Sequence, residues 1–472
     1  MRPLLVLGVC LFICVSCSFE PRYERPYIDM PECWRVEAST TCTEANVRWW
    51  ELFEDPILQQ LILTALENNK DLKVAIWRVC QYYANYMVAR APLFPQIYAQ
   101  TTDLREKFPE GAAIFLPNNF DPITSSYMWE FTLSYEVDFW GQIRSGMHVA
   151  YEELLAQVEN RRTVVLTLVA SVSQSYIRLR ELDKELEIAN KTLDARTEYL
   201  RLATLRFEGG LTSEIEVTQA RSLYDQARVA VEQIKEYIPQ EENLLSVLLG
   251  EPPTCILRGK SLDELLVPCE VPTGIPSDLL MNRPDIAGAE NMLIAAGAQI
   301  GVARAAFFPL ITLTGLYGGA SVQFSNLFSG PARTWAFGGN ILQPIFTGGM
   351  LTGQLRMSEA EQKEALYQYE QTILIAFKEV EDALIAFQQT KQIVAIEKDR
   401  VKTLKEYLHL AFLRYYEGQT DYLTVLNAEQ EFFNSQIQLA EAEGKVLLSL
   451  IDIYKSLGGG WVLDADCTAL GY

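Results

Sequence analysis

The sequence predicts a mainly helical chain with a smaller β-structured portion, organised as two internal repeats. Three observations carry this prediction. Residues 143–207 contain no proline and place apolar residues at helical spacing, with charged residues between them. Residues 128–139 instead alternate apolar and polar residues with a period of two. Short motifs beside both patterns recur 208 or 214 positions later in the chain.

The helical pattern predicts a long antiparallel hairpin. About 65 residues rising 1.5 Å each would form a rod of about 100 Å, which is stable only when it lies against partner helices. The pattern stops before Gly210, which can adopt the left-handed conformation that a chain reversal needs. Thr212 or Ser213 can then cap a second helix that runs to Leu249.

The repeat duplicates both kinds of element. The segment 88–95 recurs at 302–309, an offset of 214 residues, and the hairpin tip 205–212 recurs at 413–420, an offset of 208 residues. Each half therefore reads helix, two strands, long helix, tight turn and helix. The expected parts are a signal peptide at 1–16, a tether at 17–43, a first repeat at 44–249 whose first helix runs from about Trp49 to Arg90, a proline-rich linker at 250–276, a second repeat at 277–457 and a C-terminal tail at 458–472.

The strand pattern sorts side chains by chemistry. Within residues 128–139 the odd positions are aromatic or aliphatic and the even ones are polar or acidic, among them Glu130, Glu136 and Asp138. A strand with lipid on one face and water on the other requires this alternation, although a strand of a soluble β-sandwich alternates in the same way. Similar runs return within 311–341. Four strands cannot close a barrel, whereas strands pooled from several identical chains leave no exposed edge.

The composition argues against several classes of function. The formal net charge of −21 disfavours nucleic acid as a partner. No run of about 20 apolar residues follows the N-terminus, so a membrane-spanning helix is not expected in the mature chain. Two histidines and the absence of any Cys-x-x-Cys motif leave little from which to build a zinc site. No residues assemble into a catalytic set, so we expect neither an enzyme nor a cofactor.

The N-terminus indicates export. A charged start and an apolar stretch at 4–15 precede Val15-Ser16-Cys17, which resembles a bacterial lipoprotein cleavage site. Cys17 would then be the lipidated first residue of the mature chain. An ordinary cleaved signal peptide is the alternative, because Cys14 stands where leucine is usual. In an oxidising compartment two cysteine pairs could form disulfides or remain buried thiols: Cys33 with Cys42, and Cys255 with Cys269.

Four motifs resemble the outer-membrane factors of tripartite efflux pumps, the TolC, OprM and NodT group, and especially the lipidated branch that works with resistance-nodulation-division transporters. They occur in order at 135–141 (YEVDFWG), 274–280 (GIPSDLL), 283–285 (RPD) and 300–309 (IGVARAAFFP). The resemblance implies a homotrimer, in which three chains of four strands each form a 12-stranded transmembrane β-barrel that continues into a periplasmic α-barrel. It also implies passive conduction of drugs or other small molecules from a periplasmic adaptor and an inner-membrane transporter to the exterior.

The resemblance further implies a gate at the helical tips. Glu216 and Tyr415 match two family positions that hydrogen bond between neighbouring tips. Thr420 stands where the best-known members have arginine, and Thr424 and Asn427 stand where they have aspartates, which puts a cation-binding ring in doubt.

The remaining tip residues have simpler explanations. Arg206 and Arg414 lie in the last helical turns, where they compensate the helix dipole. Gly210 and Gly418 allow the reversals. The exposed turns would dock the adaptor.

Three alternatives remain open from the sequence. Glu130, Glu136 and Asp138 on the lumen face would give the pore a negative field, or would only keep its wall wet. The outlet of a type I protein secretion system would share this whole architecture. A periplasmic coiled-coil structural lipoprotein would explain the helices, but not the alternating strands.

Overall fold

The computed structural model describes residues 18–29, 34–35, 48–109, 123–265, 283–458 and 461–469. They divide into two compact units, each assembled from three parts of the chain. Unit 1 takes its described residues from 1–27, 78–157 and 288–369, and unit 2 takes them from 28–77, 158–287 and 370–472.

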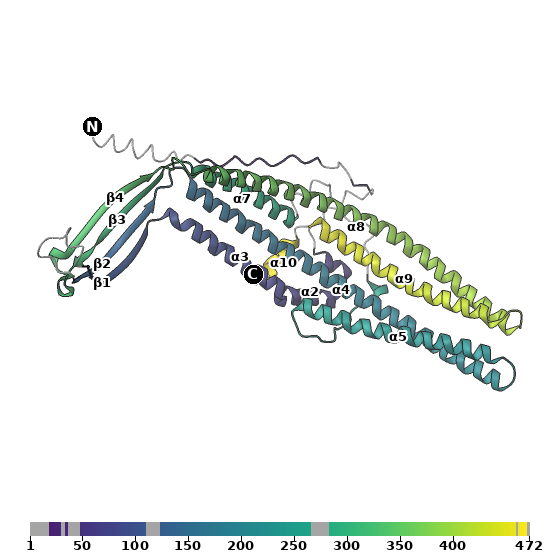
Figure 1. Ribbon diagram of the computed structural model, residues 1–472. Helices are drawn as coiled ribbons and strands as arrows, with labels where there is room; N and C mark the ends of the chain where they lie inside the picture. Colours follow the sequence, from purple (N-terminus) through teal and green to yellow (C-terminus); the bar gives the residue numbers. More distant parts are fainter. Residues whose placement is uncertain are drawn as a thin grey trace. The chain divides into compact units, whose positions relative to one another are not determined.

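Helices dominate the structure, and one antiparallel sheet accompanies them (Figure 1). The helices are α2 (Pro56–Asn68), α3 (Lys70–Arg90), α4 (Gln142–Glu208), α5 (Glu214–Leu249), α7 (Pro284–Ala305), α8 (Met350–Tyr416), α9 (Tyr422–Leu457) and α10 (Trp461–Ala469). The strands are β1 (Gln96–Lys107), β2 (Ile123–Glu136), β3 (Leu310–Ser321) and β4 (Arg333–Leu342).

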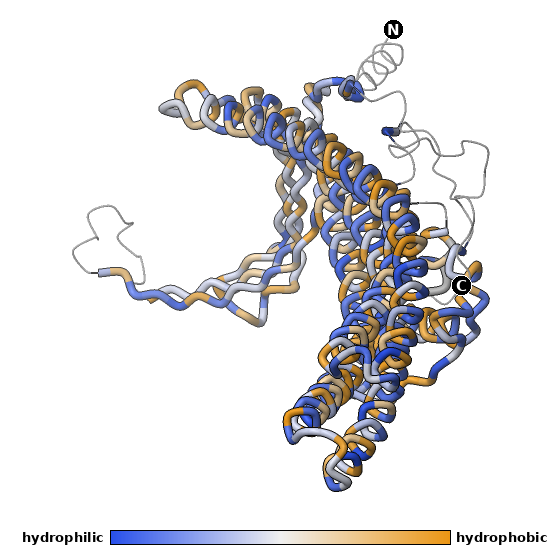
Figure 2. Tube along the Cα trace, turned by 90° about the vertical axis from the view of Figure 1, so that its right-hand side faces the viewer, coloured by the Kyte–Doolittle hydropathy of each residue, from blue (hydrophilic) through white to orange (hydrophobic). Residues whose placement is uncertain are grey.

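The long helices confirm the predicted repeat. α4 and α8 are each 67 residues long, and α5 and α9 are each 36 residues long. At 1.5 Å per residue α4 and α8 each extend about 100 Å. Figure 2 shows hydrophobic and hydrophilic positions interleaved along these helices, as expected of rods that pack against one another.

The first predicted helix is wrong as a single element. Residues 49–90 form a 3₁₀ turn (Trp49–Phe53), then α2, then α3, with a break at Asn69. The Asn69 side chain accepts a hydrogen bond from the backbone N–H of Leu72 (2.9 Å) and donates to the carbonyl of Leu248 (2.8 Å). This side chain therefore caps α3 and ties it to the end of α5.

The predicted C-terminal tail contains a helix. Trp461 at the start of α10 lies edge-on to Trp49 and Trp50, with ring centroids 6.1 and 5.3 Å apart. Trp49 also stacks on Tyr454 of α9 at 5.5 Å. Burying these rings together contributes several kcal/mol, which explains why α10 packs in unit 2 rather than extending as a tail.

The described part of the predicted linker is held against the helices. Asp55, which is fully buried, caps α2 and also accepts hydrogen bonds from the Tyr176 hydroxyl (2.7 Å) and the backbone N–H of Lys260 (3.0 Å). Arg180 of α4 donates to the Lys260 carbonyl at 2.8 Å. Residues around 260 are therefore fixed in unit 2 by buried hydrogen bonds.

The sheet has the order β1-β2-β3-β4, and all neighbouring strands are antiparallel. Residues opposite each other in the register share a face. Phe131 lies between Ala99 and Tyr317, and Tyr317 lies opposite Trp335, so aromatic residues gather on one face. The other face carries the intervening residues of every strand, which are mostly polar or small, with a few apolar residues such as Tyr98, Leu104 and Leu316. The period-two prediction for β2 is therefore confirmed.

The chain immediately after residue 17 packs on unit 1. Arg25 donates to Glu290 of α7 through Nε (2.9 Å) and Nη2, and the Tyr23 hydroxyl donates to the same carboxylate (2.8 Å). Phe19 stacks on Phe308, which directly precedes β3, at 4.5 Å, and its carbonyl accepts from Arg304. We call residues 18–29 the N-terminal strap.

Among the helices of the described ranges, α7 alone is long and apolar enough, by length and composition, to cross a membrane. The contacts of its charged residues Glu290 and Arg304 suggest another reason for its apolar composition. Glu290 and Arg304 both bind the N-terminal strap, so α7 has a packing function in unit 1.

We predict that Gly301→Ala in α7 releases the N-terminal strap. A Cβ at Gly301 would lie 2.6 Å from Glu20 Cγ, 2.9 Å from Ser145 Oγ and 3.2 Å from Glu20 Cα. The Ser145 hydroxyl can rotate away, whereas the backbone of Glu20 gives way only if the strap shifts. Amide hydrogen exchange of residues 18–25 should accelerate several-fold. Gly297→Ala, one helical turn earlier and with nothing within 4 Å, is the matched control and should leave exchange unchanged. Equal protection in both variants would contradict the assignment.

Candidate gate at the helical hairpin tips

Both hairpins reverse at a glycine in the left-handed conformation. Gly210 has φ +73° and Gly418 has φ +70°, which confirms the predicted reversals. Ser213 occupies the N-cap of α5 without a side-chain capping bond, whereas Asp421 caps α9 by accepting from the Thr424 N–H. Each tip is therefore a short turn between a helix of 67 residues and one of 36 residues.

Glu216, in the first turn of α5, is the centre of a hydrogen-bond network. Glu216 is only 9 % exposed. Its carboxylate accepts from the Tyr415 hydroxyl at the end of α8, from the Tyr199 hydroxyl of α4 (3.2 Å), and from the Thr212 hydroxyl in the turn. The predicted Tyr415–Glu216 hydrogen bond is therefore present, and it joins the two hairpins of one chain.

Arg206, in the same hairpin as Glu216, provides a second bond to Tyr415. Its Nη1 donates to the Tyr415 hydroxyl at 2.8 Å, and its guanidinium lies over the Tyr415 ring, 5.1 Å from the centroid. Burial first, and then donation to Glu216, raise the pKa of the Tyr415 hydroxyl, so it remains a donor at physiological pH. Arg206 thus has a specific partner, beyond the helix-dipole compensation that the sequence suggested.

The second tip has a similar hydrogen bond across its turn but no carboxylate at the position that corresponds to Glu216. Thr420 and Thr424 hydrogen bond through their hydroxyls at 2.9 Å, at the positions that correspond to Thr212 and Glu216 in the repeat. Thr424 also donates to Asp421 (3.0 Å). Asn427 and Arg414 are exposed. Only the first hairpin therefore supplies a carboxylate at this position.

Sequence reasoning missed the aromatic packing behind the network. Tyr199 and Tyr422 stack at 4.3 Å with their planes 7° apart, and both are buried with Tyr415. Their helical spacing is consistent with any core position, so no motif distinguishes them. They hold the Tyr199 and Tyr415 hydroxyls beside Glu216.

A half-buried acid next to the tips was also missed. Glu429 of α9 has one carboxylate oxygen without a hydrogen-bond partner within the described residues. Burial raises its pKa to about 7, and the nearby Arg196 opposes this only in part. Arg196 itself donates to the Leu223 carbonyl at 2.9 Å and to Gln430 at 3.2 Å.

The predicted lumen residues separate into two groups. Glu130 and Glu136 lie on the polar face of β2, opposite Gly318 and Thr312 of β3. Asp138 lies beyond the end of β2, and its side chain is only 9 % exposed. Its placement on the lumen-facing strand is therefore wrong.

The Asp138 carboxylate serves the start of α4 instead. It accepts from the backbone N–H groups of Ile143 (3.1 Å) and Arg144 (3.0 Å), and from Arg144 Nε (2.9 Å). The four free N–H groups of a helix start need such acceptors, and the period-two pattern could not reveal this need.

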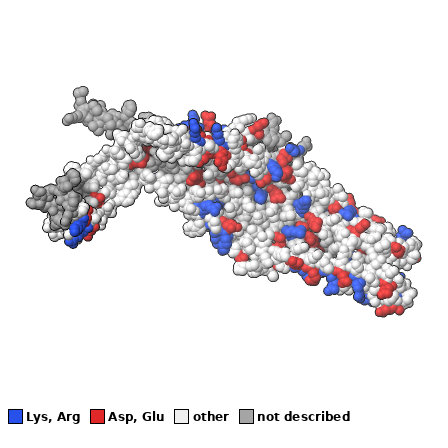
Figure 3. Space-filling view, in the orientation of Figure 1, with Lys and Arg blue, Asp and Glu red and all other residues white. Residues whose placement is uncertain are grey.

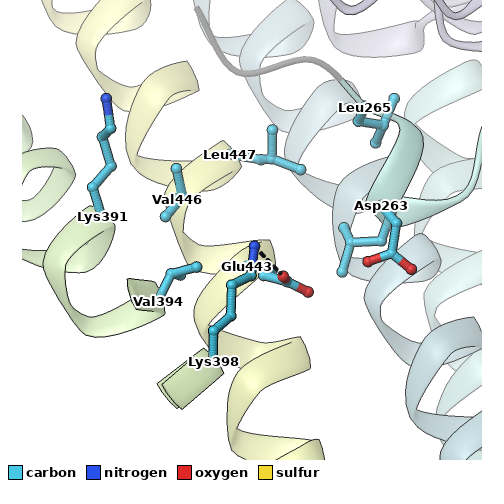
Figure 4. A pocket seen from close by; sticks show the side chains of 9 residues that line it. Asp263, Leu265, Lys391, Val394, Lys398, Glu443, Val446 and Leu447 are labelled. Atoms are coloured by element: carbon cyan, nitrogen blue, oxygen red, sulfur yellow. Dashed lines mark ion pairs between the residues drawn. The ribbon is translucent and has the colours of Figure 1, made fainter. Parts of the chain in front are cut away.

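A separate groove of about 420 Å³ lies in unit 2 between α8, α9 and the segment Leu262–Leu265 (Figure 4). Lys398 on its wall pairs with Glu443 at 3.1 Å, and Lys184 bridges Glu443 (2.6 Å) and Asp263. Lys391, also on the wall, has its ammonium group over the Phe387 ring, 5.2 Å from the centroid. The two carboxylates of the groove are therefore already paired, and Lys391 is the lining charge outside these ion pairs.

The remaining sequence predictions fall largely outside the described residues. Cys17, Cys33, Cys42 and Cys269 are among the residues that the structure does not describe, and Cys255 is an exposed free thiol. Within the described ranges, no group of three or more His, Cys, Asp or Glu side chains could hold a metal ion.

A model of the family described as "Outer membrane efflux protein" matches residues 61–251 and 275–459. The chain belongs to this family. The two matched stretches coincide with the two repeats, which confirms the repeat architecture and the resemblance that the four motifs indicated.

Relatives of this outer membrane efflux protein match over nearly their whole length. TtgC of Pseudomonas putida, a probable efflux pump outer membrane protein, is 36 % identical over 98 % of this chain and 96 % of its own length. Outer membrane protein OprJ of Pseudomonas aeruginosa is 33 % identical over 94 % and 93 %. The open-state structure of the MtrE outer membrane channel of Neisseria gonorrhoeae superposes with a TM-score of 0.85, at 31 % identity over 94 % of this chain and 99 % of its own.

These findings select among the functions that the sequence left open. The chain is an outer-membrane efflux channel, and a periplasmic coiled-coil scaffold is excluded as its class. The strands beside the helices belong to a fold that combines a helical barrel with a β-barrel.

We predict that Tyr415→Phe loosens the tips. The substitution removes one donor to Glu216 and the acceptor of Arg206, which costs about 1 to 3 kcal/mol for buried charged partners. Hydrogen exchange of residues 199–216 should accelerate about tenfold or more. Tyr416→Phe is the control, because Tyr416 is 60 % exposed and the substitution keeps the ring that contacts Phe412 and Tyr415. Equal protection in the two variants would contradict the network.

We predict that the tips gain stability as the pH falls through 7. The folded pKa of Glu429, about 7, lies above its ordinary value of 4.5, so the folded state binds the proton more tightly. Protonation of Glu429 therefore contributes about 1 to 3 kcal/mol to the stability of the folded tips. This contribution is fully present below pH 4.5 and is lost as the pH rises to about 7. Glu429→Gln should remove this dependence and stabilise the tips at pH 8. Hydrogen exchange of residues 422–435 between pH 5 and 8 measures it, and an unchanged pH dependence in Glu429→Gln would refute it.

Proposed function

We propose that this channel is a homotrimer that passively conducts small molecules from a periplasmic adaptor and an inner-membrane transporter to the exterior, and that the network around Glu216 holds its inner mouth closed. The polypeptide performs no chemistry in this scheme. The protein encloses a water-filled path, and it shifts the equilibrium of a gate between an open and a closed state toward the closed one.

The sheet supports assembly from several copies. β1 and β4 have no strand partner on their outer edges within the described chain. Each copy therefore has two unpaired edges, one on β1 and one on β4. In hydrocarbon every unpaired N–H and C=O is costly, so edges of neighbouring copies must pair until the sheet closes. The apolar face then turns to lipid and the polar face to water.

The tip network is the observation that carries the gate. Glu216 and Arg206 belong to the first hairpin, and both bind Tyr415 of the second. Separating the hairpins breaks these bonds together and leaves a buried carboxylate short of a donor. A few charged hydrogen bonds at about 1.5 to 3 kcal/mol each are enough to bias the mouth toward the closed state.

The carboxylates of the polar face set the field in the path. Glu130 and Glu136, repeated in each copy, would favour cations and neutral molecules over anions. Asp138 is not part of this set, because its carboxylate is engaged by α4.

The N-terminal strap supports a lipid anchor at Cys17. Phe19, two residues later, stacks on Phe308 (4.5 Å) and lies 6.3 Å from Trp140, at the end of the sheet where helices α4 and α7 join it. An acyl chain on Cys17 would therefore start beside the apolar rim of the barrel. We therefore expect the anchor to lie at the inner leaflet of the outer membrane.

The substrate class follows the relatives. Relatives that are 36 % identical to this chain include proteins named for antibiotic, toluene and solvent efflux. Toluene and other solvents are small and apolar, and antibiotics too are far smaller than the unfolded polypeptides of a type I secretion outlet. We therefore favour efflux of small molecules, apolar ones among them.

Single-channel recording tests the gate. We predict that Glu216→Ala in planar bilayers raises the fraction of time the channel is open by at least about tenfold, because one lost charged hydrogen-bond centre is worth 1.4 kcal/mol or more. The control is Glu214→Ala, an exposed carboxylate in the same helical turn. Equal, measurable open fractions in the wild type and Glu216→Ala would overturn the gate, while the absence of conductance in both proteins would overturn the channel.

A further inference from the structure

The sheet sorts its charged residues by face. Arg105 and Lys107 of β1 lie opposite Ser125 and Ile123, on the face that carries the aromatic residues. Arg333 of β4 lies opposite Gly319, which lies opposite Trp129, and so shares that face. The carboxylates of the opposite face are Glu106, Glu130 and Glu136.

The three cations also lie at one end of the sheet. β1 ends at Lys107 and β4 begins at Arg333, whereas helices join the chain at the other end, before Gln96 and after Leu342. In Figure 3 the visible surface of the sheet is largely free of charged atoms until this far end, where basic and acidic atoms gather. We call Arg105, Lys107 and Arg333 the rim cations.

The rim cations have no acidic partner within the described residues. All three are exposed, and none takes part in an ion pair there. Asp103 is the one carboxylate of the strands on their face, and it lies opposite Tyr127, one position nearer the helices on that face. These exposed charges are therefore available to an anionic partner from outside the described residues.

Aromatic residues stand beside the rim cations on the same face. The connection between β3 and β4 folds back so that Phe328 stacks on Trp129 (6.1 Å) and Phe324 lies edge-on to Tyr127 (5.6 Å). Phe328 is 72 % exposed and Trp335 is 68 % exposed. Rings at this position mark the level where the hydrocarbon of a membrane meets its headgroups.

We propose that the rim cations and their aromatic neighbours form a binding surface for phosphorylated lipid of the outer leaflet, with the phosphates on the guanidinium and ammonium groups and the acyl chains on the aromatic face. The inference rests on the proposed barrel, because that assembly turns the aromatic face to lipid and the helix-free end outward. Guanidinium groups match phosphate oxygens in a bidentate geometry, and ammonium groups add point charges.

Assembly would concentrate these charges. β1 and β4 are the two edges of the sheet, so pairing of β4 with β1 of the next copy brings Arg333 close to that copy's Arg105 and Lys107. Adjacent strands lie about 4.8 Å apart, which is within the span of one phosphorylated headgroup. The binding surface is therefore shared between copies, and bound lipid would cross-link the barrel.

The experiment uses the full assembled protein in vesicles of phosphatidylcholine with either bisphosphorylated lipid A or its dephosphorylated form. The wild type should unfold at a temperature several degrees higher with the phosphorylated form, and should bind it at least about tenfold more tightly, since each cation near an anionic surface adds to affinity. Arg105→Gln/Lys107→Gln/Arg333→Gln should lose both differences.

Two further variants serve as controls. Arg105→Lys/Lys107→Arg/Arg333→Lys keeps the charges and should retain most of the phosphate dependence. Glu106→Gln alters a charge at the same level on the opposite face and should leave it intact. Equal stabilisation by both lipids, or an unchanged response in the Gln variant, would overturn the proposal. Conductance in phosphatidylcholine alone, expected to be equal in wild type and Gln variant, separates this failure from failure of the channel.

Discussion

Backbone hydrogen bonding at the two edges of the sheet is the constraint on which the architecture depends. Each chain supplies four strands, and the outer edges of β1 and β4 remain unpaired in the described chain. An aromatic face and a polar face make this sheet suitable for lipid on one side and water on the other. Closure among copies then accounts for the exposed rings, the lumen carboxylates and the need for a duct beneath.

The helical hairpins obey a second, related constraint. Helices of 67 residues cannot stand alone, so they pack along their length and leave few places where the duct can change its width. The tips are such places, since each turn is short and exposed. There a single carboxylate, Glu216, binds residues from both hairpins. In the gate we propose, this network would supply much of the energy of closure.

Much of this structure was predictable because each element of the repeat occurs twice in the sequence. The bounds of α4 and α5 agree with the predicted ones within a few residues, and Gly210 and Gly418 have the predicted conformation. The errors arose where a polar side chain decides the structure locally. Asn69 interrupts a helical pattern by capping α3, and Asp138 continues a strand pattern while capping α4. Periodicity describes faces, whereas capping depends on a single side chain.

The aromatic support of the gate could not be predicted for another reason. Tyr199 and Tyr422 are far apart in sequence, and only the packing of the two hairpins brings their rings together. Nothing in their local sequence separates them from ordinary core residues. Contacts between hairpins of one chain, like contacts between copies, follow from tertiary structure.

Cross-linking of the sheet edges tests the central claim most directly. A background free of Cys80, Cys255 and the other mature cysteines except Cys17 would carry one cysteine at Gln100 of β1 and one at Thr334, Ala336, Gly338 or Asn340 of β4, all on the polar face. Oxidation of outer membranes should give, for one pairing register, a covalent ladder that ends at three copies. Failure of every position to cross-link, or a ladder that ends at two copies or continues past three, would contradict the account.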